Sequence, residues 1–200
     1  LLEVGCGTGE FLQFFFETGF DVTGLEASPL MLKTAREKCD KFADLHVGNA
    51  EHLPFDDNEF DFSAMLTVIE FLEDPTLALI ELARVTRKAI LIGFLNKHSL
   101  YNLGRCKNPE RKGMLDHATW YSWTQMKKLV YTSLGRKTSR ASSVLPGPVA
   151  TWKEKHLCKY LNKPLYNPHI GAYTAFTIEL LEGPIKTPLM AVKPKIGAIE

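Results

Sequence analysis

The chain opens with the stretch L-L-E-V-G-C-G-T-G, residues 1–9, and this stretch decides the fold. Apolar residues of the kind that end a buried strand come first, and a helix-like run, 10–16, follows the stretch. Between them lie three glycines at a spacing of two residues, Gly5, Gly7 and Gly9. Glycines at such a turn let a ligand lie against the main chain, and the first helical turn offers unpaired N–H groups. The stretch therefore predicts an α/β fold with a ligand at its first turn; an ordinary strand-to-helix turn is the alternative.

Two polar residues that follow predicted strands suit a nucleoside. The strand 20–25 ends at Glu26, whose carboxylate can accept hydrogen bonds from both hydroxyls of a ribose. The strand 45–48 is followed by Asn49, whose amide can pair with an adenine edge. The glycine spacing is one residue tighter than the G-x-G-x-x-G of dinucleotide-binding folds, which argues against a dinucleotide.

Four motifs in a fixed order carry a resemblance to a known family. They read E-V-G-C-G-T-G, L-E-A-S-P, G-N-A-E-H-L-P-F-D-D-N-E-F-D and V-I-E-F-L-E-D-P. This order resembles the class I S-adenosylmethionine-dependent methyltransferases, and among them the type 11 group, over residues 1–95. The resemblance implies S-adenosyl-L-methionine as cofactor, S-adenosyl-L-homocysteine as product, and direct displacement at the sulfonium methyl by an acceptor atom. Because the sulfonium already carries the leaving group, a general base is optional.

The resemblance also implies which residues bind the cofactor. The methionine part would face Glu3, the backbone of Gly5, Cys6 and Gly7, and, at its amino-acid end, Leu66 and Thr67. The ribose would be bound by Glu26, and the adenine would lie beside Ala27, Met31, Asn49, Ala50 and Glu51. Two positions depart from the family pattern. Asn49 stands where aspartate is usual, which should weaken adenine binding modestly. Phe71 stands where many members have histidine, so the sequence identifies no catalytic residue.

Length and composition predict one domain. The 200 residues are 45% apolar with a net charge of +1, which suits a single soluble α/β domain, and no run of about 18 apolar residues could span a membrane. The cysteines lie at positions 6, 39, 106 and 158 without metal-ligand spacing, so we expect no metal and a cytoplasmic location. Because the chain begins in mid-strand without methionine, we expect that an upstream segment is missing.

Alternating strand-like and helix-like segments predict a doubly wound, mainly parallel sheet with an antiparallel edge pair. The helices that follow the first are each opened by a capping residue and are expected over 28–39, 74–87 and 122–135. Further strands are expected over 60–66 and 89–95, and the edge pair over 136–145 and 172–181. Phenylalanines surround the first helix, 10–18, so we expect it to be sandwiched. The tail from Gly183 has no assignment.

Charge divides the chain into unlike parts. Residues 1–96 hold 7 Lys and Arg against 17 Asp and Glu, a net of −10, whereas residues 97–163 hold 14 against 3, a net of +11. The basic and aromatic stretches 96–118 and 147–170 lie outside the cofactor-binding half, 1–95, and are expected to form the acceptor site. We expect a small or medium-sized acceptor that is anionic. A solvated basic face is an equal alternative, and a nucleic-acid acceptor is less favoured.

Two other functions fit parts of the pattern. A non-catalytic S-adenosylmethionine-binding regulator or scaffold subunit fits the lack of an evident base. An NAD-binding oxidoreductase fits the fold alone and disagrees with the glycine spacing. The sequence identifies neither the acceptor nor the oligomeric state.

Overall fold

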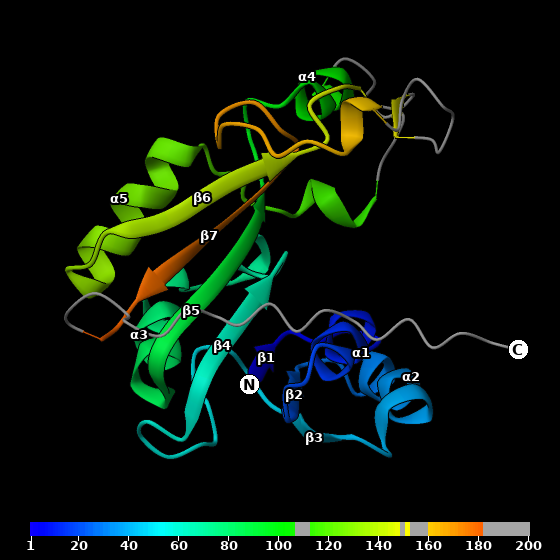
Figure 1. Cartoon of the computed structure of the whole chain (residues 1–200), viewed down its shortest axis with the longest axis vertical. Helices are drawn as coiled ribbons and strands as arrows, with labels where there is room; N and C mark the ends of the chain where they lie inside the picture. Colours follow the sequence, from blue (N-terminus) through cyan, green and yellow to red (C-terminus); the bar gives the residue numbers. More distant parts are fainter. Residues whose placement is uncertain (107–112, 149–150, 153–159, 182–200) are drawn as a thin grey trace, which may run out of the picture.

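The computed structural model describes residues 1–106, 113–148, 151–152 and 160–181, which form a seven-stranded sheet with helices on both faces (Figure 1). The strands are β1 (Leu2–Val4), β2 (Val22–Glu26), β3 (Ala43–Val47), β4 (Phe60–Leu66), β5 (Thr86–Leu95), β6 (Thr138–Val144) and β7 (Tyr173–Glu179). Their order in the sheet is β3-β2-β1-β4-β5-β7-β6. Strands β1 to β5 are parallel, whereas β7 is antiparallel to β5 and β6 is antiparallel to β7. The predicted doubly wound sheet and its antiparallel edge pair are confirmed.

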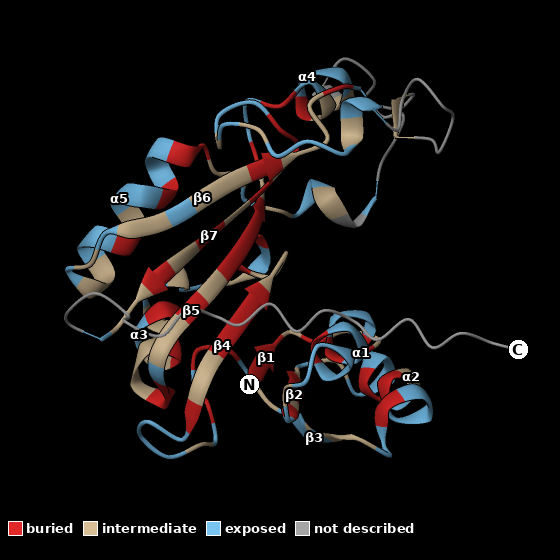
Figure 2. Cartoon of the chain, in the orientation of Figure 1, coloured by how far each residue is buried: buried red, intermediate tan, exposed pale blue. Residues whose placement is uncertain are grey.

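The helices divide between the two faces of the sheet. They are α1 (Glu10–Glu17), α2 (Pro29–Cys39), α3 (Pro75–Val85), α4 (Leu100–Cys106) and α5 (Trp123–Leu134), with short 3-10 turns η1 (Ile69–Phe71) and η2 (Met114–Asp116). Neighbouring residues of β4 face the two sides. Ala64 joins the apolar cluster of α1 and α2, and Met65 joins that of α3 and α5. Figure 2 shows the buried residues concentrated along the central strands, as expected of parallel strands covered on both faces.

The capping residues read from the sequence define the helix starts. The Ser28 side chain accepts a hydrogen bond from the Met31 N–H, and Asp74 accepts from two backbone N–H groups of α3. Ser122 and Gln125 form the predicted capping box, and Gly135 ends α5 in the left-handed conformation. Helix α3 ends two residues earlier than predicted because Thr86 already pairs with Phe60 as the first residue of β5.

The expectation that α1 is sandwiched was wrong. Among the described residues, α1 is covered on one side only: Leu12 and Phe15 are buried, whereas Phe11, Phe14 and Phe16 are about half exposed. The segment 96–118, for which the sequence predicted no element, contains helix α4 and the turn η2. Among the described residues, no helix combines the length and apolar character needed to cross a bilayer. The tail from Gly183 lies outside the described residues.

Candidate functional site

The opening glycines adopt backbone conformations that only glycine takes easily. Gly5, Gly7 and Gly9 have φ values of +74°, +56° and +85°, all in the left-handed region. A Cβ at Gly5 would clash with Val68, and one at Gly9 would lie 2.6 Å from Sγ of Cys39. At Gly7, by contrast, the nearest atom to such a Cβ is Cε of Met31, 3.5 Å away. The turn is therefore packed from behind at its two ends and open at its middle glycine.

Glu26 is fixed against this turn by hydrogen bonds to both of its carboxylate oxygens. The N–H of Gly7 donates to Oε2 at 2.9 Å, and the N–H of Ser28 donates to Oε1 at 2.9 Å. The turn is tied to β2 as well, because the N–H groups of Gly5 and Cys6 both donate to the carbonyl oxygen of Leu25. Each carboxylate oxygen of Glu26 retains capacity to accept a further hydrogen bond.

A cavity of about 540 Å³ opens in front of Gly5, Gly7 and Glu26 at the carboxyl ends of β1, β2 and β4. In open α/β sheets, ligands bind at this edge. The cavity brings together most of the residues assigned to the cofactor, namely Gly5, Gly7, Glu26, Ala27, Met31, Asn49, Ala50, Glu51 and Thr67. Its volume falls within the usual range for small-molecule sites.

The other three residues assigned to the cofactor do not line the cavity. Cys6 is buried among the apolar residues of the α1 and α2 cluster, where burial raises the pKa of its thiol to about 12. Leu66 packs against the same cluster. Glu3 is 1% exposed; burial and, secondarily, the charge of Glu26 raise the pKa of its carboxyl to about 8. Its Oε2 atom has no hydrogen-bond partner among the described residues.

Asn49 and Glu51 are held by hydrogen bonds within the loop after β3. The Oδ1 atom of Asn49 accepts from the N–H of Glu51 at 3.3 Å. The Oε1 atom of Glu51 accepts from the N–H of Asp74 at 3.2 Å, which ties the loop to the start of α3. Both residues line the cavity, and these hydrogen bonds hold their side chains in position.

One wall of the cavity consists of residues that the sequence did not predict to bind the cofactor. It comes from the connection between β4 and α3 and consists of Val68, Phe71, Leu72 and Glu73. The V-I-E-F-L-E segment was recognised only as part of a family motif, and its apolar residues gave no separate signal for a ligand. Thr67, which begins this wall, has a φ of +59°, a rare conformation for a β-branched residue. Such strain concentrates at functional sites.

The two inserts expected to form the acceptor site come together beyond the end of β5 (Figure 1). The rings of Tyr101 and Trp152, one from each insert, have centroids 4.9 Å apart. The amide of Asn96 donates to the carbonyl oxygens of His169 and Gly171, both at 3.2 Å. Parts of both inserts, 107–112, 149–150 and 153–159, lie outside the described residues. The described parts form one lobe at the edge of the sheet where the cavity lies.

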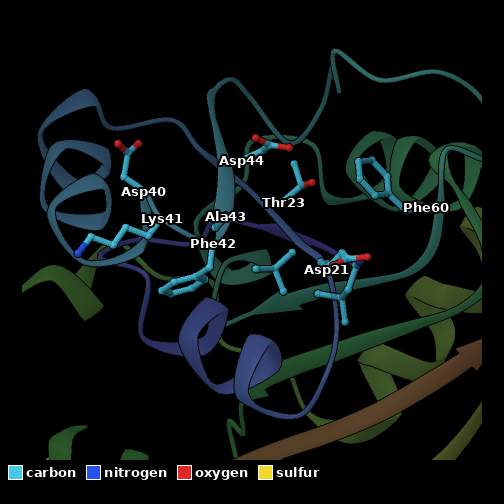
Figure 3. Close-up of a pocket in the computed structure, with 10 residues that line it drawn as sticks. Asp21, Thr23, Asp40, Lys41, Phe42, Ala43, Asp44 and Phe60 are labelled. Atoms are coloured by element: carbon cyan, nitrogen blue, oxygen red, sulfur yellow. The ribbon is translucent and has the colours of Figure 1, made fainter.

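A second cavity, of about 440 Å³, lies at the opposite edge of the sheet (Figure 3). It is lined by residues at the amino ends of β2, β3 and β4, among them Thr23, Asp44 and Phe60. Ligands of open α/β sheets bind at the carboxyl ends, so we assign the functional site to the first cavity.

Comparison with known proteins identifies a related family and similar folds. Residues 2–92 match the model of the type 11 family described as a methyltransferase domain. The chain is 39% identical over 106 residues to a malonyl-[acyl-carrier protein] O-methyltransferase of Serratia marcescens, covering 52% of this chain and 41% of that protein. It is 35% identical over 89 residues to a demethylmenaquinone methyltransferase of Tropheryma whipplei, covering 44% and 37%. The chain thus spans about two fifths of the length of these relatives.

Solved structures share the fold over most of the chain. A Thermotoga maritima protein described as a possible histamine N-methyltransferase superposes with a TM-score of 0.72 at 24% identity, covering 89% of this chain and 80% of that one. The Synechocystis magnesium protoporphyrin IX methyltransferase, solved with bound S-adenosylhomocysteine, has a TM-score of 0.62 at 14% identity, covering 89% and 72%. Residues 2–92 thus match the type 11 methyltransferase family, and the described chain shares its fold with solved S-adenosylmethionine-dependent methyltransferases.

Proposed function

We propose that the chain binds S-adenosylmethionine in the cavity at Gly5, Gly7 and Glu26 and transfers its methyl group to a small or medium-sized acceptor. The observation that carries the proposal is the Glu26 carboxylate, held at the cavity by the N–H groups of Gly7 and Ser28. A carboxylate fixed in this way can accept from both ribose hydroxyls without losing side-chain entropy on binding.

The described residues fit each part of this cofactor. Gly7 leaves space for a ligand against the main chain, where a Cβ would project toward Met31 and the cavity. Glu3 is buried next to the turn and has an unpartnered oxygen, and a cationic amino group would lower the pKa of its carboxyl and pair with the resulting carboxylate. Asn49, Ala50 and Glu51 would contact the adenine, and Thr67 the amino-acid end.

The chemistry needs little beyond position. S-adenosylmethionine supplies a methyl group on a sulfonium, which is already a good leaving group. The contribution of the protein is to hold the methyl in line with the acceptor atom and to exclude water. The apolar wall of Val68, Phe71 and Leu72 provides exclusion of water on one side of the cavity. Under this proposal residues 1–95 bind the cofactor and the lobe of the two inserts binds the acceptor.

For the acceptor we propose a carboxylate-bearing or otherwise anionic molecule. The net charge of +11 over residues 97–163 favours an anion near the lobe. One of the relatives is named for O-methylation of a malonyl-[acyl-carrier protein]. An acceptor of that kind, with a malonyl carboxylate oxygen as the methylated atom, agrees with the anionic acceptor proposed for this chain.

Calorimetry followed by turnover tests the proposal. S-adenosylhomocysteine should bind the chain, and NAD should not. With S-adenosylmethionine present, product should form from malonyl-coenzyme A or from another anionic acceptor in a panel, and neutral analogues should react more slowly. Binding of NAD in preference to S-adenosylhomocysteine would point to an oxidoreductase and contradict the proposal.

One observation favours a second function, that of a non-catalytic S-adenosylmethionine-binding subunit. Phe71 lines the cavity and is 37% exposed, at a position where many family members have histidine. Binding of S-adenosylhomocysteine without turnover on any acceptor of the panel would favour this second function.

A further inference from the structure

Three buried polar groups at the carboxyl ends of β1, β4 and β5 lack hydrogen-bond partners. They are Oε2 of Glu3, Oε2 of Glu70 and the hydroxyl of Tyr173, none of which is bonded within the part of the chain that the structure describes. Buried polar atoms are nearly always paired, so several unpaired atoms near one cavity call for a ligand. Glu3 is explained by the proposed cofactor. Glu70 and Tyr173 are not, because neither belongs to the cofactor residues nor lines the cavity of the cofactor.

Tyr173 reaches this place because of its neighbour on the adjacent strand. It pairs with Leu95 across the antiparallel β5 and β7, and its ring lies over Gly93. A Cβ at position 93 would collide with the phenol hydroxyl, so only glycine permits this orientation. Thr67, which does line the cavity, lies beside this position, because its N–H donates to the carbonyl oxygen of Gly93 at 2.8 Å.

Glu70 lies next to Tyr173 and connects the cavity wall to the lobe. It is 1% exposed, and its Oε1 accepts from the N–H of Leu95 at 2.6 Å. Its carbonyl oxygen accepts from the N–H of Thr119, the residue that follows the first insert. Because Leu95 also pairs with Tyr173 across β5 and β7, the hydrogen bond to the Leu95 N–H holds the Glu70 carboxyl beside Tyr173.

We infer that the hydroxyl of Tyr173 and the carboxyl of Glu70, between Thr67 and the lobe, bind an oxygen atom of the methyl acceptor. The inference rests on the proposed function, because it assigns the acceptor side of the same site. The acceptor class it names is a molecule with a carboxylate or carbonyl oxygen next to the transferred methyl.

Both groups are donors below about pH 7. Burial, more than any other effect, raises the pKa of Tyr173 to about 12 and that of Glu70 to about 7, so the phenol is neutral and the carboxyl holds its proton below about pH 7. Besides burial, the charges of Glu70 on η1 and Glu3 on β1 raise the pKa of Tyr173. Tyr121, just before α5, is a further titratable group whose pKa is raised by burial and by the charge of Glu70. Among the described residues, no cation contributes to the pKa of Glu70 or Tyr173. O–H groups that donate to a carboxylate form short, strong hydrogen bonds. The positive charge that would balance the bound carboxylate would come from the sulfonium of the cofactor.

The test uses malonate as the acceptor probe and sinefungin, an analogue with an ammonium group in place of the sulfonium, as the cofactor probe. Malonate should bind the complex of the full chain with sinefungin. Tyr173→Phe should weaken malonate binding about tenfold and leave sinefungin affinity within about twofold. The matched control is Tyr131→Phe, at a tyrosine of α5 that is 60% exposed, and it should change neither affinity.

A second variant tests the carboxyl. Glu70→Gln keeps an acceptor for the N–H of Leu95 and a donor for the ligand, so it should fold. Between about pH 6 and about pH 7.5 malonate affinity of the wild type should fall, because Glu70 loses its proton and repels the anion, whereas Glu70→Gln should show no such fall. In the sinefungin complex the amino group of the ligand lowers the pKa of Glu3, so Glu3 should stay ionised over this range in both proteins.

Three results would overturn the inference: no malonate binding to the sinefungin complex, equal malonate binding by wild type and Tyr173→Phe, or weaker sinefungin binding by Tyr173→Phe that accounts for any loss of malonate affinity. Failure of the wild type to bind both sinefungin and S-adenosylhomocysteine is a different result, which would remove the proposed function and this inference with it.

Discussion

At the residue scale, comparing Gly7 with Gly19 separates the effect of a side chain on ligand binding from its effect on backbone conformation. Gly7 and Gly19 both have positive φ, +56° and +98°, and an added Cβ has space at both. Gly7→Ala and Gly19→Ala should therefore each cost about 1 kcal/mol of unfolding free energy. Only Gly7→Ala should also weaken S-adenosylhomocysteine binding, by about tenfold or more, because its methyl group projects toward the cavity. Chemical denaturation and calorimetry measure the two effects. Equal affinity in both variants would contradict the placement of the ligand on the turn.

The buried carboxyls predict how stability depends on pH. Burial raises the pKa of Glu3 to about 8 and that of Glu70 to about 7, both above the unfolded values. Between about pH 5 and pH 7 the folded protein keeps two protons that the unfolded chain has released, so the free energy of unfolding should fall as pH rises, by at most about 1.4 kcal/mol per pH unit for each group. Glu3→Gln should flatten part of the fall in ligand-free protein and weaken S-adenosylhomocysteine binding. Urea titrations at several pH values measure the slope, and stability that rises over this range would disagree with two protonated carboxyls.

At the element scale, helix α3 holds the loop that would contact the adenine. Arg84 donates to the carbonyl oxygens of Leu53 and Phe55 at 3.1 and 2.8 Å, and it also pairs with Glu81 and Asp57. In return Oε2 of Glu81 accepts from the N–H of Leu53 at 3.0 Å. The loop 48–57 has no regular strand or helix. We call these hydrogen bonds of Arg84 and Glu81 to the loop the α3 clamp, and we expect it to fix the positions of Asn49 and Glu51.

Arg84→Lys should break the α3 clamp although charge is kept, because an ammonium lacks the planar set of donors that reaches two carbonyl groups and two carboxylates. We expect a loss of about 1–3 kcal/mol in unfolding free energy, faster hydrogen exchange at the Leu53 N–H, and weaker S-adenosylhomocysteine binding. Arg87→Lys is the control, since Arg87 pairs with Asp61 at the surface and its side chain is 53% exposed. Unchanged exchange at Leu53 in Arg84→Lys would show that the loop is held by other contacts.

At the scale of the whole molecule, ligand binding and stability should be coupled. The cavity draws on β1, β2, β4, the loop after β3 and the turn before α3, so a ligand there bridges much of the parallel half of the sheet. Saturating S-adenosylhomocysteine, at about 100 times its dissociation constant, should add about 2.7 kcal/mol to the free energy of unfolding. NAD at the same concentration should add nothing measurable in a thermal unfolding scan. Equal stabilisation by both would show a cavity that does not distinguish the methionine part of the proposed cofactor from the pyrophosphate and nicotinamide parts of NAD.

The sequence predicted those parts of the molecule that depend on neighbours in the chain. The glycine turn, the caps at Ser28 and Ser122 and the carboxylate at the end of β2 are local patterns, and each has the predicted conformation or position. Tyr173 could not be predicted, because it reaches Thr67 only through the antiparallel register of β5 and β7 and the absence of a side chain at Gly93. The exposed side of α1 was missed for a similar reason, since burial depends on what packs against a helix and not on its own composition.

The most direct test of the central claim is a crystal structure of the chain with S-adenosylhomocysteine. We expect an adenosyl group in the cavity of about 540 Å³, with both ribose hydroxyls within hydrogen-bond distance of the Glu26 carboxylate and the ligand against the backbone of Gly7. A ligand bound at the opposite edge of the sheet, or a Glu26 carboxylate without contact to the ribose, would contradict it.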